Sequence, residues 1–140
     1  MQTRLLILRA GLVAWFLWHL AFAYLSTFAP QLGADVVGWS SPETWSDELI
    51  AMSQQYGMVM VLLAGVYMVM LIDPIRYLGL IWVAVGEQVL GIAYGLYIYT
   101  SLGQLTQAQL ITQVAVNSLL ICGMIFLWLG LHRKYQAQNA

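Results

Sequence analysis

Four long apolar stretches, separated by short polar connections, dominate the chain. Each is long enough to cross the hydrocarbon core of a bilayer as a helix, which takes about 20 residues. The predicted spans cover residues 10–29, 50–72, 77–100 and 110–131. Because all three connections are short, the pattern favours antiparallel neighbours in an up-down-up-down four-helix bundle.

Composition supports this interpretation. Of the 140 residues, 61% are hydrophobic and 8% are charged, whereas a soluble domain usually carries about 25% charged residues. We therefore expect one integral membrane domain over residues 1–140, with the lipid bilayer as its solvent. The net charge of −1 does not indicate a nucleic-acid partner, and the single cysteine, Cys122, excludes an internal disulfide.

The charges outside the spans are sorted by sign. All basic residues lie at the N-terminus, in the second connection or at the C-terminus: Arg4, Arg9, Arg76, Arg133 and Lys134. The first connection is acidic, with Asp35, Glu43, Asp47 and Glu48. With four spans the three basic places share one membrane face, and the positive-inside rule puts that face in the cytoplasm. We expect both termini to lie in the cytoplasm. The expected location of the protein is a bacterial cytoplasmic membrane or another energy-converting membrane.

Helix-boundary signals occur in each connection. Asp73-Pro74 predicts a turn that ends the second span. Ser41-Pro42-Glu43 predicts a helix start, with the chain lying in the interface through Trp45. The residues from Thr106 to Gln109 fit a capping box that opens the fourth helix.

Glu87 is the one charge inside the third span. A carboxylate at membrane depth costs roughly 3 kcal/mol or more, so it needs a partner or a function. At about 1.5 Å per residue, His19 and Glu87 lie about 14 and 15 Å from the cytoplasmic ends of their spans. The matched depth allows a His19–Glu87 contact with Asn117 about one turn above it. This hypothetical ligand or proton site also includes Gln88 and Tyr94.

Two glycines support an inward-facing Glu87. Gly91 and Gly95 follow it at i+4 and i+8, on the same side of the helix. They form a GxxxG pattern, which is typical of closely approaching membrane helices. We therefore expect Gly91 and Gly95 to pack against another helix.

Glutamines point toward the same region from the outer face. Gln109, Gln113 and Asn117 recur at i, i+4 and i+8 of the fourth helix, and Gln54-Gln55 lies near the outer end of the second. One interpretation is a polar funnel that leads from the outer face to His19 and Glu87. The other is that the glutamines simply lie in the interface, with Asn117 alone inside.

The role of the polar cluster stays open between three alternatives. It is a hydrogen-bonded pair that fixes helix register, a ligand-binding or proton-handling site, or a contact of Glu87 with another subunit. No metal site is predicted, since the chain lacks a zinc-binding pattern. Phosphate-loop and catalytic-triad patterns are missing as well. The cofactor is unknown; a quinone or a pigment ligated by His19 fits the pattern.

Short motifs in this layout are shared with a known group. These are Arg9-Ala10-Gly11 at the first span, Gln55-Tyr56-Gly57-Met58 in the second, Asp73-Pro74 in the turn and Gly86-Glu87-Gln88 in the third. The chain resembles the DoxX-like and BphX-like small bacterial membrane proteins, which have four spans in a similar length. The resemblance implies this architecture and assigns no functional residue. Some members of these families are associated with quinone-linked redox systems.

Two functions follow as hypotheses. The small loops and the missing catalytic constellation favour a non-enzymatic membrane subunit or accessory protein, within a larger redox or energy-converting complex or a homo-oligomer. The alternative is a protein that binds a quinone, a lipid or another small hydrophobe, or that passes protons, through His19, Glu87 and Asn117.

Overall fold

The computed structural model describes residues 2–38, 44–103 and 105–139. Regular structure within these ranges is entirely helical. Four helices are long and apolar enough to cross a membrane. The all-α class and the four candidate spans predicted from the hydropathy pattern are thus confirmed.

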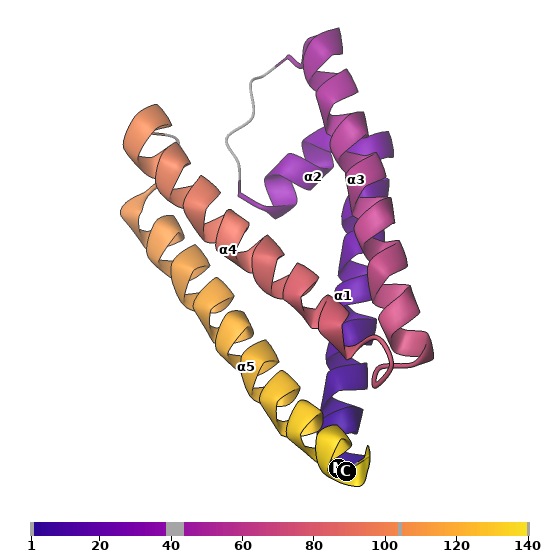
Figure 1. Ribbon diagram of the computed structural model, residues 1–140. Helices are drawn as coiled ribbons and strands as arrows, with labels where there is room; N and C mark the ends of the chain where they lie inside the picture. The colour runs from indigo at the N-terminus through magenta and orange to yellow at the C-terminus, as the bar shows by residue number, and fades with distance from the viewer. Residues whose placement is uncertain (1, 39–43, 104, 140) are drawn as a thin grey trace. The chain divides into compact units, whose positions relative to one another are not determined.

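Figure 1 shows the order of the elements along the chain. They are α1 (Gln2–Phe28), α2 (Pro30–Val36), α3 (Asp47–Ile72), the 3-10 turn η1 (Leu78–Leu80), α4 (Ile81–Tyr97), the π-helical turn η2 (Ile98–Leu102) and α5 (Gln107–Asn139). α1 begins before, and α5 ends after, the spans predicted at 10–29 and 110–131. The polar residues at these helix ends do not break a helix, because arginine and glutamine have good helix propensity.

The chain between the first two spans differs from expectation. α2 was not predicted; Pro30 at its start is a residue well suited to the first helical position. Ser41-Pro42-Glu43 lies outside the described residues. Residues 44–46 are not helical, so the predicted helix through Trp45 is wrong.

Helix α3 begins after Trp45 because its N-terminal capping residues lie at Ser46 and in the turn that follows. Ser46 is its N-cap, and the Ser46 hydroxyl accepts a hydrogen bond from the Leu49 N–H at 3.3 Å. Asp47 and Glu48 occupy the first turn, where carboxylates interact favourably with the helix dipole. This cap is followed directly by the apolar run, so the helix begins here.

Two other boundary predictions are confirmed. α3 ends at Ile72, and Pro74 follows in the turn. At the start of α5, the Thr106 N–H donates to Gln109 Oε1 at 2.8 Å, while the Gln109 N–H donates to Thr106 Oγ1 at 3.2 Å. This is a reciprocal capping box.

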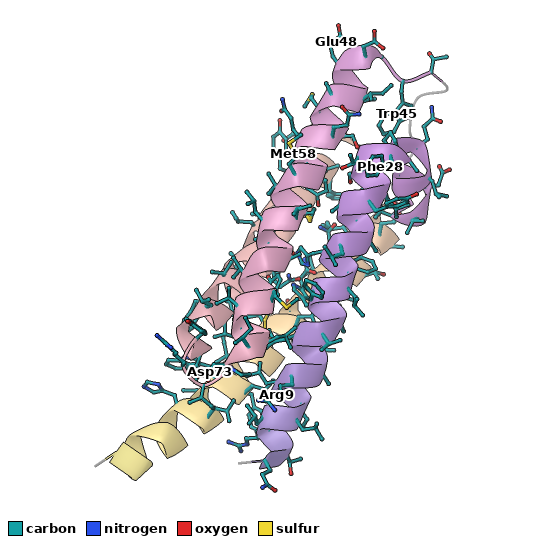
Figure 2. The ribbon with its side chains drawn as sticks, turned by 90° about the vertical axis from the view of Figure 1, so that its right-hand side faces the viewer. Arg9, Phe28, Trp45, Glu48, Met58 and Asp73 are labelled. Carbon is teal, nitrogen blue, oxygen red and sulfur yellow. The ribbon has the colours of Figure 1, made fainter. Side chains whose placement is uncertain are left out.

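The chain folds as two compact units. The N-terminal hairpin unit is Arg9–Asp73, and the C-terminal hairpin unit is Pro74–Ala140 together with Met1–Leu8. In the N-terminal hairpin unit α1 and α3 run side by side in opposite directions, with Arg9 and Asp73 at one end and Glu48 at the other (Figure 2). In the C-terminal hairpin unit α4 lies antiparallel against α5 (Figure 1).

Small residues let α1 and α3 approach closely in the N-terminal hairpin unit. A Cβ atom at Gly57 would clash with Thr27 Oγ1 and lie 3.0 Å from the Ala23 carbonyl oxygen. Nearby, the Ser53 hydroxyl donates to the Ser26 carbonyl at 3.0 Å. Helix pairs in membranes commonly use such small and hydroxylated contacts.

Aromatic and cationic contacts join the parts of the C-terminal hairpin unit. Trp82 of α4 meets Trp128 of α5 edge to face, with ring centroids 5.4 Å apart. Arg4, at the start of α1, lies over the Phe126 ring, 4.9 Å from its centroid. The first turns of α1 therefore pack beside the end of α5.

We expect Gly57→Ala to destabilise the protein by about 1–3 kcal/mol, the usual effect of inserting a methyl group into a filled space. Gly65→Ala is the matched control on the same helix, since nothing lies within 4 Å of a Cβ there. Unfolding in mixed detergent micelles, followed by circular dichroism, measures both variants. Equal stability of the two would contradict the tight α1–α3 contact.

Candidate functional site

His19 is a fully buried ionisable residue of the N-terminal hairpin unit. It lies on α1 and has 0% of its surface exposed. Its Nδ1 lies 2.8 Å from the Trp15 carbonyl oxygen, one helical turn back. A carbonyl oxygen only accepts hydrogen bonds, so Nδ1 carries a proton, and in the neutral ring Nε2 is the accepting nitrogen.

Tyr67 of α3 lies beside this imidazole. The two ring centroids are 5.0 Å apart with the planes tilted by 47°, and Tyr67 is also 0% exposed. Tyr67 was not among the predicted site residues. The signal that could have identified it is the spacing of the buried positions on α3, which are Gly57, Met60, Ala64, Tyr67 and Met70. That spacing puts the phenol on the packed face of the helix.

The third span contains two neighbouring polar residues with different surroundings. Glu87 is half-buried, whereas Gln88 is buried with 6% exposure. Consecutive helical residues point about 100° apart, so the two side chains face different directions. Tyr94, the third candidate on this helix, is 62% exposed. Gln88 is thus more enclosed than the charged residue beside it.

Gln113 and Asn117 of α5 face the glycines of α4. The Gln113 side-chain amide donates from Nε2 to the Gly91 carbonyl at 2.9 Å. A Cβ at Gly91 would lie 3.0 Å from Asn117 Nδ2. At Gly95 it would lie 2.7 Å from Gln113 Oε1. The two glycines therefore leave the space that these amide side chains occupy.

The remaining glutamines have separate positions. Gln109 takes part in the capping box with Thr106 and is exposed. Gln54 and Gln55 are exposed on α3, in the N-terminal hairpin unit. The outer polar funnel that would combine these residues with Gln113 stays a prediction.

The candidate residues are thus divided between the two units. His19 and Tyr67 belong to the N-terminal hairpin unit; Glu87, Gln88 and Asn117 belong to the C-terminal hairpin unit. Within their own units the structure brings His19 to Tyr67, and Gln113 and Asn117 to Gly91. The His19–Glu87 contact stays a prediction.

These groups can form hydrogen bonds and hold or transfer protons. Imidazole and phenol both donate and accept, and carboxamides bind polar atoms in two directions. Within the described ranges, no group of three or more His, Cys, Asp or Glu residues is arranged to hold a metal ion. The local chemistry therefore suits a proton or a small polar ligand group.

No protein-family model, no curated protein and no solved structure matches the chain.

We expect Gln113→Leu to weaken the α4–α5 contact, because it removes the hydrogen bond to the Gly91 carbonyl. Such contacts in membranes contribute about 0.6 kcal/mol on average and up to about 1.7 kcal/mol. Gln55→Leu makes the same chemical change at an exposed position and serves as the control. Unfolding free energies in detergent compare them, and a larger loss for Gln55→Leu would contradict the assignment.

Proposed function

We propose that the protein is a small, non-enzymatic integral membrane subunit or accessory protein of a larger membrane assembly. One observation carries the proposal: only 6% of the α5 span is buried within the chain, against 33% of the third span. Because so few of its residues are buried, much of the surface of this span is open to lipid or to other helices.

The chemistry of α5 agrees with this proposal. Its polar side chains Gln113 and Asn117 are turned toward α4. Large apolar side chains are exposed along the rest of the helix: Ile111, Val116, Leu119, Phe126 and Leu129. Membrane helices associate through packing and scattered hydrogen bonds, so such a face suits a neighbouring helix as well as acyl chains.

The proposal also covers the orientation of the spans and the membrane in which the protein lies. The four spans run up-down-up-down with both termini in the cytoplasm, because the basic residues flank the spans on one side only. The layout further supports membership of the DoxX-like and BphX-like group and a bacterial cytoplasmic membrane. The larger assembly would then be a redox or energy-converting complex.

A photo-crosslinking amino acid placed at Leu119 tests the partner. Leu119 is 74% exposed, whereas Leu131 is 1% exposed and serves as the control position. In intact membranes we expect Leu119, and not Leu131, to give adducts with another protein chain or a second copy. Adducts with lipid alone at Leu119 would contradict the accessory-subunit proposal.

A second candidate function rests on the buried imidazole. His19 and Tyr67 are both fully enclosed, and the His19 ring is oriented by its bond to the Trp15 carbonyl. Buried ionisable groups within membrane spans are expensive and commonly functional. The alternative is therefore a protein that binds a quinone, a lipid or another small hydrophobe, or that passes protons, with Glu87 as a further participant.

Two conservative variants separate the candidates. If the site binds a ligand, Tyr67→Phe and Glu87→Gln should each lose a co-purifying hydrophobe that native mass spectrometry finds on the wild-type protein. Tyr24→Phe is the control, because Tyr24 is exposed. Assembly into a complex should be unchanged. Retention of the hydrophobe by Tyr67→Phe and Glu87→Gln would exclude this second function.

A further inference from the structure

The arginine at the start of α1 is seated on the last turns of the fourth span. Arg4 lies over the Phe126 ring at 4.9 Å, which is within the range of a cation–π interaction. A Cβ atom at Gly130 would overlap the Arg4 guanidinium. Because glycine has no side chain, Gly130 leaves a notch in the surface of α5, and the Arg4 guanidinium occupies it.

A second arginine lies on the same face of α5. Phe126, Gly130 and Arg133 are spaced at i, i+4 and i+7, so they follow one side of the helix. Arg133 is exposed, one turn beyond the notch that holds Arg4. The structure thus places two permanently charged cations on neighbouring turns of one surface.

The C-terminal hairpin unit contains little negative charge that could balance Arg4 and Arg133. Glu87, within the third span, is its single carboxylate side chain, while Arg76 and Lys134 add further positive charge. Arg76 lies over the Tyr77 ring, in the turn that follows Asp73. Neither α5 nor the first turns of α1 contain a carboxylate side chain. Two arginines placed on neighbouring turns of this surface therefore form a suitable site for an anion.

The depth of the pair identifies the source of that anion. Trp82 and Trp128 meet at this end of the unit, and tryptophan is typical of the membrane–water interface. Phe126, beneath Arg4, is 61% exposed and offers an apolar surface to an acyl chain. We propose that Arg4 and Arg133 bind the phosphate of an anionic phospholipid, with Gly130 and Phe126 holding the Arg4 guanidinium in position.

Lipid retention by the full chain tests this proposal. The protein in non-ionic detergent is mixed with phosphatidylglycerol or phosphatidylcholine, and bound lipid is counted by native mass spectrometry. We expect phosphatidylglycerol to be retained preferentially. Arg4→Gln and Arg133→Gln should each weaken this binding about fivefold, which corresponds to the ~1 kcal/mol that a basic residue contributes near an anionic surface.

Two matched controls separate a built site from simple charge attraction. Gly130→Ala should weaken phosphatidylglycerol binding without a change of charge, because its methyl group displaces Arg4. Gly123→Ala, on the same helix with nothing within 4 Å of its Cβ, should not. Arg9→Gln removes one positive charge from α1 at an exposed position in the other unit and should have little effect.

Three outcomes would overturn the proposal. The first is equal retention of the two lipids, and the second is an Arg9→Gln loss as large as that of Arg4→Gln. The third is displacement of the lipid by millimolar inorganic phosphate, which would identify a site for free anions. Circular dichroism of each variant verifies that the helices are intact, and Arg133→Gln tests the site even if Gly130→Ala does not fold.

Discussion

The hydrocarbon core of a bilayer contains no water to pair with backbone N–H and C=O groups, and each unpaired group costs several kcal/mol. Helices satisfy these groups within each span, which accounts for the all-helical spans. A helical carbonyl oxygen still has a second lone pair. Three buried or half-buried polar side chains use such an acceptor: His19 Nδ1 at Trp15, the Ser53 hydroxyl at Ser26 and the Gln113 amide at Gly91.

Glycine residues, which have no side chain, also allow the helices to approach closely. Gly57 leaves space for Thr27, Gly95 for Gln113, and Gly130 for the Arg4 guanidinium. In each case a polar group of a neighbouring helix fills the space beside the glycine. Packing rather than the hydrophobic effect holds helices together in lipid, so close approach and side-chain-to-backbone hydrogen bonds occur at the same places.

The candidate functions use different residues, except that Phe126 belongs both to the apolar face of α5 and to the Arg4 site. The imidazole–phenol pair of His19 and Tyr67 is enclosed, the outer face of α5 is apolar, and the Arg4–Arg133 surface is cationic at the end of a span. Each proposal therefore depends mainly on a different surface. The proposals can therefore be tested separately.

Local patterns in the sequence determined the four apolar helices, the sorting of charges around them, the turn at Pro74 and the capping box of Thr106 and Gln109. These depend on residues a few positions apart, so hydropathy and capping rules suffice. The sequence also identified Glu87 and the glycines as inward candidates, but it overlooked Tyr67 and began α3 too early.

Only the tertiary structure decided which groups meet. It turned Gln113 and Asn117 toward α4, enclosed Gln88 more than Glu87, placed Tyr67 against His19 and seated Arg4 at Gly130. Hydropathy cannot predict these contacts because an almost uniformly apolar span has no strong polar face to set its rotation. The rotation is set instead by the shape of the neighbouring helix and by the carbonyl oxygens that it offers.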